Sequence, residues 1–408
     1  MSAKGEPGPE ETDAEERTPR AAIPAILAHL CGRPDRPIPD AWLRSVAEPA
    51  EAAELADAAD RTMVAGPLWA ALTSAQRDLL PEEVSEHLQD QYLGNALRWE
   101  MTRRLLCSAA TSLAEAGIPM APLKGAALQL IAYEDPGRRA LTDLDLLVPD
   151  EDIETAQDIL SRGAAEVHQP RAEHHHLGAI IMPGAEGMIE LHDSASHARL
   201  WPQRGEMLAD GSPITVDGAS FIMPDKVDLW LHTACHGIGH APNYWPRMAA
   251  DLALLHGSPD WSGEHWEAVW QAAQEGEVPR TVLVAAAIAN LGRIPADLLA
   301  LTRGDINAAA VETRAREAWT IAATTRGFKF GPWSTSWVTG NERRRARFRQ
   351  YLLPPSARLS EKLPVSRTTA RVLYPCGVLF RCFELAKTGV AWRLALRGRS
   401  LAERAFRS

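Results

Sequence analysis

The stretch from residue 122 to 149, PLKGAALQLIAYEDPGRRALTDLDLLVP, constrains the fold more than any other part of the chain. An apolar approach ends at Lys124-Gly125, a helix-compatible run follows, and the stretch closes on two aspartates that flank a leucine. This pattern predicts a strand at 118–123, a helix at 125–133 and a second strand at 143–148. Such a strand–helix–strand unit is typical of a chain that folds around a sheet with helices packed on it.

The two aspartates, Asp143 and Asp145, are the strongest candidates for metal ligands. Alternate side chains of a strand share a face, so the two carboxylates project together while Leu144 points into the fold. Two neighbouring carboxylates repel each other, and hard oxygen ligands at this spacing suit Mg²⁺. The alternative is an exposed strand end or turn, where closely spaced aspartates are common.

The glycine turn upstream of the aspartates offers backbone N–H groups and a positive helix terminus to a phosphate. Lys124 is a candidate ligand for a triphosphate, or else a surface lysine at a strand end. Gly125 is better explained by its backbone, because glycine permits a close approach and unusual dihedral angles. A phosphate cradle beside metal-binding carboxylates is the minimum apparatus for phosphoryl or nucleotidyl transfer.

A further strand is predicted at 188–192, MIELH, where Glu190 lies on the face opposite its two apolar neighbours. Glu190 is either a third metal-binding carboxylate or a solvated strand glutamate. His192 follows two residues later, so it lies on the same face and is a candidate substrate contact. Arg139 could hold a phosphate through its guanidinium fork or form a structural pair with a carboxylate.

Several histidines suggest a metal site at first sight. His232, His236 and His240 are spaced so that one helix face could present three imidazoles. The segment lacks the glutamate of an HExxH motif, and two glycines weaken the helix there. These histidines are therefore interpreted as residues at the edge of the core or in a substrate pocket, with His236 the candidate for the pocket. Residues 174–176, three consecutive histidines, indicate at most a loop cluster near an acceptor site.

Composition limits the classes of protein to which the chain can belong. Of its 408 residues, 46% are hydrophobic and 24% are charged, which is ordinary for a soluble globular protein. The formal charge of −10 argues against a general nucleic-acid binder. Five cysteines without a CxxC pair indicate reduced thiols, and the sequence contains neither a secretory signal nor an apolar run long enough to span a membrane. We expect a cytoplasmic protein.

Hydrophobic periodicity and charge divide the chain into five segments. The segment 343–408 carries a local charge of +13, which leaves −23 on the remainder. Its apolar residues favour amphipathic helices packed on the acidic body, although a basic tail could also bind nucleic acid or a membrane surface. The predicted segments are a disordered acidic tail (1–20), an N-terminal helical region (21–105), the core (106–224), a C-terminal helical domain (225–340) and a basic amphipathic helical tail (341–408).

Taken together, the LKG…R…DLDLLV pattern, MIELH and the later LHTACHGIGH…WPRMAADLALL resemble the uncharacterised bacterial nucleotidyltransferases of the polymerase-β-like superfamily. Members of that family often accompany gene clusters for peptide natural products, including lasso peptides. The resemblance covers about residues 106–256. The chain departs from the superfamily at Gly125-Ala126, where Gly-Ser or Gly-Gly is usual, and in the longer spacing from this glycine to Asp143.

The resemblance implies an α/β (α+β) nucleotidyltransferase core with a mixed sheet, flanked by N-terminal and C-terminal helical regions. It implies Mg²⁺, or Mn²⁺ in its place, on Asp143, Asp145 and Glu190, and an NTP whose phosphates contact Lys124, Gly125, Ala126 and Arg139. The enzyme would move an NMP to a hydroxyl or phosphate of a small-molecule or peptide acceptor. Glu190 is in addition a candidate base that deprotonates the acceptor.

Two other classes of function stay open at this point. One is a catalytically silent scaffold or peptide-binding protein with the same fold, consistent with Ala126 and the unusual spacing. The other is a nucleic-acid-binding protein that uses the basic C-terminal tail. The sequence leaves open the base of the NTP, the acceptor and the oligomeric state.

Overall fold

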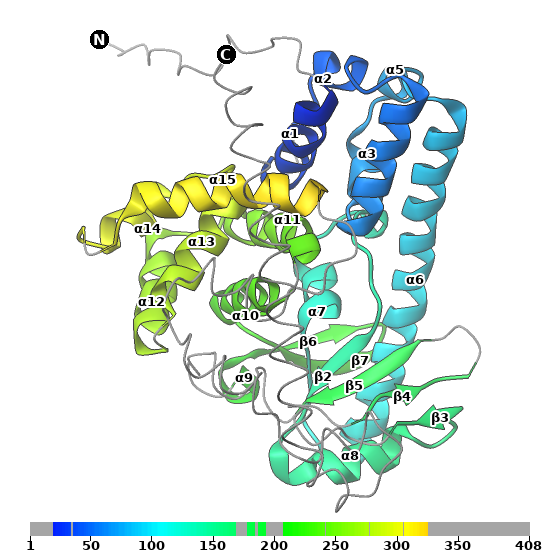
Figure 1. Cartoon of the computed structure of the whole chain (residues 1–408). Coiled ribbons are helices and arrows are strands. Elements are labelled where there is room, and N and C mark those ends of the chain that lie inside the picture. Colours follow the sequence, from blue (N-terminus) through cyan, green and yellow to red (C-terminus); the bar gives the residue numbers. More distant parts are fainter. Residues whose placement is uncertain are drawn as a thin grey trace, which may run out of the picture.

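The structure is a computed structural model that describes residues 19–324 apart from 34–35, 169–177, 184–186, 193–206, 241, 277 and 305 (Figure 1). The predicted acidic tail up to residue 18, the basic tail and the histidines 174–176 lie outside the described residues. Within the described ranges the chain is mixed α/β, with one sheet surrounded by helices. No helix in these ranges is long and apolar enough to cross a membrane.

Six helices precede the sheet, and the last of them is much longer than the others. α6 extends from Glu82 to Glu115 and runs along one side of the molecule to the sheet (Figure 1). It passes through the predicted boundary at residue 105 without interruption, and the division into segments stays a prediction. The other five are α1 (Pro19–Gly32), α2 (Asp40–Arg44), α3 (Pro49–Arg61), α4 (Ala65–Ala71) and α5 (Ser74–Arg77).

The main sheet is mixed, as predicted, with the strand order β1-β2-β5-β4-β3. β2 and β5 are parallel neighbours, and the other pairs are antiparallel. A separate hairpin, β6–β7, lies next to β1, and the N–H of Ile222 donates to the carbonyl of Met120 at 2.9 Å. The strands are β1 (Ala121–Pro122), β2 (Leu144–Leu147), β3 (Glu166–Val167), β4 (Ile180–Ile181), β5 (Met188–His192), β6 (Ser212–Val216) and β7 (Ala219–Met223).

Several strands are shorter than the sequence pattern predicts. The apolar run 118–123 yields only the two residues of β1, because Pro122 has no N–H for the ladder and Lys124 already begins helix α7. Asp143 lies just before β2 instead of inside it. β5 has the predicted bounds, and the hairpin turns at Asp217-Gly218, where both residues have positive φ as a tight primed turn requires.

Helices between and after the strands pack around the sheet and continue into a helical layer. α7 (Lys124–Ile131) and α8 (Ile153–Leu160) follow β1 and β2, and the short α9 (Met207–Asp210) precedes the hairpin. The helical layer then contains α10 (Lys226–Gly239), α11 (Trp245–His256), α12 (Gly263–Glu275), α13 (Pro279–Ala289), α14 (Ala296–Leu301) and α15 (Ala308–Thr324), with one-turn 3-10 helices at Pro136–Arg138, Asp150–Asp152 and Pro242–Tyr244.

The first helix and the last helices lie side by side although they are far apart in sequence (Figure 1). α1 packs on α11 and α15, so the helices before the sheet and those after it share one interior. A single cluster of buried apolar side chains extends from Ala22 to Ala323. Its burial is the main favourable contribution to folding. The candidate site therefore sits on a framework that both halves of the helical structure support.

The fold makes a specific prediction about pH. His256, in the last turn of α11, lies 5.4 Å from the ring of Trp266, and the indole N–H of Trp230 donates to its Nδ1 at 3.4 Å. Burial lowers the pKa of His256 from 6.5 to about 4. The unfolded chain therefore binds more protons in this interval, so stability is complete above pH 6.5 and declines as the pH falls towards 4.

At pH 5 the contribution of His256 corresponds to a loss of about 2 kcal/mol in the free energy of unfolding. The variant His256→Gln keeps an acceptor for the indole but cannot be protonated, so its stability should fall less steeply in this range. Urea unfolding of both proteins at several pH values measures the difference. If the free energy of unfolding has the same pH dependence in both proteins between pH 6.5 and 4, the imidazole of His256 is already protonated in the folded protein.

Candidate active site

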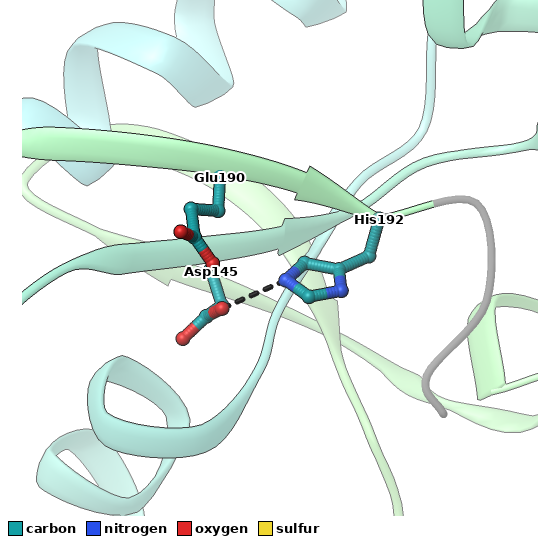
Figure 2. Close-up of side chains that lie close together, drawn as sticks. All are labelled: Asp145, Glu190 and His192. Atoms are coloured by element: carbon teal, nitrogen blue, oxygen red, sulfur yellow. Dashed lines mark hydrogen bonds and ion pairs between the residues drawn. The ribbon is translucent and has the colours of Figure 1, made fainter. Parts of the chain in front are cut away.

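The candidate site is built on the parallel strands β2 and β5. The register pairs Asp145 with Glu190, and paired residues of parallel strands project to the same face. His192, two residues after Glu190, lies on this face as well, and Figure 2 shows the three side chains converging. One potential ligand atom from each of the three lies within 4.8 Å of the others. The opposite face of these strands carries leucines and an isoleucine that belong to the main hydrophobic core. The alternation of side chains along each strand therefore places the polar groups on one face and the core residues on the other.

Asp145 is the most deeply buried acid of this group, with an exposed fraction of 1%. Its Oδ1 accepts from the ammonium of Lys124 at 2.5 Å and from Nε2 of His192 at 2.7 Å (Figure 2). Because an ionised carboxylate can only accept, Nε2 of His192 carries the hydrogen. Burial alone would raise the pKa of Asp145, but Lys124 and His192 outweigh it and hold the pKa well below its ordinary range.

Asp143 occupies a different position from the one predicted for a paired strand ligand. It precedes β2, it is half-buried, and it lines the same cavity as Asp145 and Glu190, but it is not one of the three convergent groups. The hydroxyl of Thr142 donates to its Oδ1 at 2.9 Å. Burial, and next the negative charge of Asp145, raise the pKa of Asp143. A carboxylate in this situation gains most from a cation in the cavity.

The Lys124-Gly125 turn lies on the same side of the sheet as the acids. Lys124 has a φ of 45°, a conformation that L-residues rarely adopt, and this places its side chain on Asp145. A Cβ on Gly125 would lie 2.4 Å from Leu141 and 2.5 Å from the guanidinium of Arg139, so only glycine fits. Both residues line the cavity, whereas Ala126 is buried and does not.

Arg139 is engaged by Asp251, an acid from α11. Its Nε donates to Oδ1 at 2.8 Å and its Nη2 to Oδ2 at 2.9 Å, and the hydroxyl of Tyr133 also donates to Oδ1, at 2.7 Å. Arg139 is 5% exposed and Asp251 is 3% exposed. Of the two roles open from the sequence, the geometry shows the structural pair with a carboxylate. This pair fixes α11 to the segment that precedes β2.

The other wall of the cavity comes from the end of α10 and the start of α11. Rings follow one another there, with centroids 4.2 Å apart for His236 and His240 and 4.7 Å apart for His240 and Tyr244. Burial, followed by the nearby cations, lowers the pKa of His236 well below its ordinary value. The cavity has a volume of about 260 Å³ and includes Arg247 and Met248 in its lining.

Among the described residues, the side chains that converge closely enough to hold a metal are Asp145, Glu190 and His192, and the histidines of α10 are not among them. His232 is buried, and burial together with Lys124 lowers its pKa to about 3. Of the two predicted pocket histidines, His236 lines the cavity, while His192 is fully buried behind Asp145. His192 therefore orients the carboxylate that it contacts.

The residues present fit a divalent cation that prefers oxygen ligands. Asp145 and Glu190 offer carboxylates on adjacent strands, and Asp143 adds a third at the same cavity. The hydrogen bond from His192 to Asp145 is the kind of outer contact that holds a metal-binding carboxylate in place. The convergent group of Asp145, Glu190 and His192 could offer a divalent cation two carboxylates and an imidazole.

Comparison with known proteins agrees with the fold. A family model described as "Uncharacterised nucleotidyltransferase" matches residues 48–291, more than half of the chain. Such a site on such a sheet defines a nucleotidyltransferase-type protein. The chain belongs to this uncharacterised nucleotidyltransferase family. Neither the curated proteins nor the solved structures give a significant match.

Two features of the site could not be found from the sequence. The partners Arg139 and Asp251 are 112 residues apart, and no local pattern links them. The sequence analysis also did not predict Arg247 and Tyr244 as site residues, because an arginine and a tyrosine near a helix start are common in any protein. The only signal was that Arg247 belongs to the WPRMAADLALL segment, which contributed to the family resemblance and which Tyr244 directly precedes.

The geometry predicts that the pair of Arg139 and Asp251 is structural. Asp251→Asn leaves a buried guanidinium without its carboxylate and should cost about 3–5 kcal/mol of unfolding free energy. Replacing both, with Arg139→Met and Asp251→Leu, should recover most of this loss. Denaturant unfolding measures each value.

A matched control is the exposed pair of Lys226 and Asp260, in which the side chain of Asp260 is 64% exposed. Asp260→Asn removes the same chemical group and should change the free energy of unfolding very little, because solvent screens an exposed pair. An equally small effect for Asp251→Asn would mean that Arg139 does not depend on Asp251.

Proposed function

We propose that the protein is a metal-dependent nucleotidyltransferase that moves an NMP from an NTP to an acceptor hydroxyl or phosphate and releases pyrophosphate. The observation that carries the proposal is the meeting of Asp145 and Glu190 on adjacent parallel strands, with Asp143 and Lys124-Gly125 at the same cavity. The family match gives the class of reaction. Mg²⁺, with Mn²⁺ as the alternative, is the cation that the carboxylates would hold.

The acidic and basic residues of the cavity would have different roles. Asp143, Asp145 and Glu190 would hold the cation, which when bound neutralises charge on the phosphates and on the attacking oxygen. Lys124 supplies a mobile ammonium that is 2.5 Å from Asp145 and within the cavity, where it can contact a phosphate instead. Glu190 is the candidate to accept the proton of the acceptor. The turn at Gly125 lets the nucleotide approach the backbone.

The acceptor is proposed to be a small molecule or a peptide, with a modified peptide natural product as the example that the family resemblance suggests. The cavity wall of His236, His240 and Tyr244 offers flat rings against which a base or an acceptor could stack. This wall faces the same cavity as the acids, so both substrates could occupy it together.

A second candidate function is a catalytically silent scaffold. The observation that favours it is the ion pair between Lys124 and Asp145, which compensates the buried carboxylate without a metal. Calorimetry with each NTP, with and without Mg²⁺, separates the two candidates. An enzyme should bind an NTP in a metal-dependent way. A silent scaffold should show no metal-dependent binding of any NTP.

The enzyme makes a sharp prediction for Asp143→Asn. The variant removes one cavity carboxylate that Asp145 repels, so the unliganded protein should keep its melting temperature or gain slightly. Transfer should fall by about 10³-fold, because a lost ligand removes several kcal/mol of charge stabilisation. The assay incubates α-labelled NTPs with candidate acceptors and detects the mass shift of the product.

Asp150→Asn is the matched control, since Asp150 is exposed and does not line the cavity. It should transfer at the wild-type rate. Full activity in Asp143→Asn would remove this carboxylate from the mechanism, and full activity in both Asp143→Asn and Glu190→Gln would refute the proposed site.

A further inference from the structure

The cavity contains three cationic side chains, and two of them have carboxylate partners. Lys124 contacts Asp145, and Arg139 forms its bidentate pair with Asp251. The third, Arg247, has no carboxylate within ion-pair distance among the described residues, although it lines the same cavity. Buried or half-buried arginines are normally paired with an anion. The charge of Arg247 is therefore not compensated by a carboxylate of the described residues.

The nearest acid on its own helix is already fully used. Asp251 stands four residues after Arg247 on α11, which is the spacing of a helical ion pair. Both oxygens of Asp251 accept from Arg139 instead, and one accepts from Tyr133 as well. Asp251, and more weakly Asp143, attract Arg247 electrostatically, but neither carboxylate lies within ion-pair distance of it.

Helix stability does not explain Arg247 either. It is the third residue of α11, and a cation in the first turn of a helix opposes the positive end of the helix dipole. Burial, and then the charge of Arg139, lower the pKa of Arg247, which means that its surroundings disfavour its charge. An anion entering the cavity would relieve this cost.

The structure holds Arg247 in a defined place. Its guanidinium carbon lies 4.9 Å from the centre of the Tyr244 ring, within the range of a cation–π contact. The next residue, Met248, packs into the space that Gly237 leaves open on α10, where a Cβ would approach to 2.5 Å. The close crossing of α10 and α11 thus fixes the arginine relative to the histidine wall.

We propose that Arg247 binds the phosphate tail of the nucleotide, in the role that the sequence pattern gives to Arg139. This inference rests on the proposed function, because it assigns a ligand at the same site. A guanidinium fork matches two phosphate oxygens, and such charged hydrogen bonds are the strong ones. The carboxylates of Asp143 and Glu190 then face the cation, and Arg247 faces the phosphates that are not transferred.

The test compares Arg247→Met and Arg247→Lys with the wild type. Calorimetry measures binding of each NTP and of inorganic pyrophosphate, both with Mg²⁺. Arg247→Met should weaken both by about 10- to 100-fold, as expected for the loss of charged hydrogen bonds. Arg247→Lys should recover part of the affinity, because it keeps the charge and loses the fork.

Thermal unfolding of the unliganded proteins distinguishes a ligand-binding role from a structural one. Arg247→Met removes an unpaired cation, so its melting temperature should be unchanged or higher, while stabilisation by added pyrophosphate should be lost. Arg104→Met is the control for charge, since Arg104 is on the surface of α6 with its side chain 76% exposed. This control should bind both ligands as the wild type does.

The outcomes separate the two proposals. If the wild type binds NTP and pyrophosphate and Arg247→Met binds them equally well, the role of Arg247 is refuted and the proposed function stands. A lower melting temperature with unchanged affinity would likewise assign Arg247 to the structure alone. If the wild type binds neither ligand with Mg²⁺, the proposed function fails, and the inference about Arg247 fails with it.

Discussion

The buried carboxylate of Asp145 is the interaction on which the rest of the site depends. An ionised acid with an exposed fraction of 1% in a central strand is costly unless other groups compensate it. Lys124 and His192 do so from two directions, one from the start of α7 and one from β5. The positive φ of Lys124 and the full burial of His192 place both side chains where they compensate the charge of Asp145. A bound cation would have to share Asp145 with both, which makes Lys124 the natural group to move.

Two arginines of similar appearance have different environments in the same cavity. Arg139 donates to both carboxylate oxygens of Asp251, to which Tyr133 also donates, and this pair connects α11 to the segment before β2. Arg247 is held by an aromatic ring and meets no carboxylate at ion-pair distance among the described residues. The first arrangement builds the cavity wall, and the second leaves positive charge for a ligand. The cavity lining therefore mixes both charges: its cations come from the start of α7, the segment before β2 and α11, and its acids come from β2, β5, the residue before β2 and α11.

Much of the fold and part of the site followed from sequence patterns. The mixed sheet agrees with what the family resemblance implies, and the bounds of β5 and the helices after residue 225 agree with the periodicity of the sequence. Glu190 and Asp145 are neighbours because alternation fixed their faces and the parallel register aligned them. The length of the strand predicted at 118–123 was overestimated. The apolar run does not reveal that a proline and the start of a helix shorten the strand. The roles of Arg139 and His192 depend on partners that are distant along the chain.

The sequence by itself determined the candidate acids, the glycine turn upstream of them and the family to which these motifs belong. Only the tertiary structure decided which charges meet. Local patterns fix the face on which a side chain projects, because that depends on backbone geometry alone. They cannot fix the partner, because Asp145 finds Lys124 and His192, and Asp251 finds Arg139, through the packing of elements that the chain brings together from far apart.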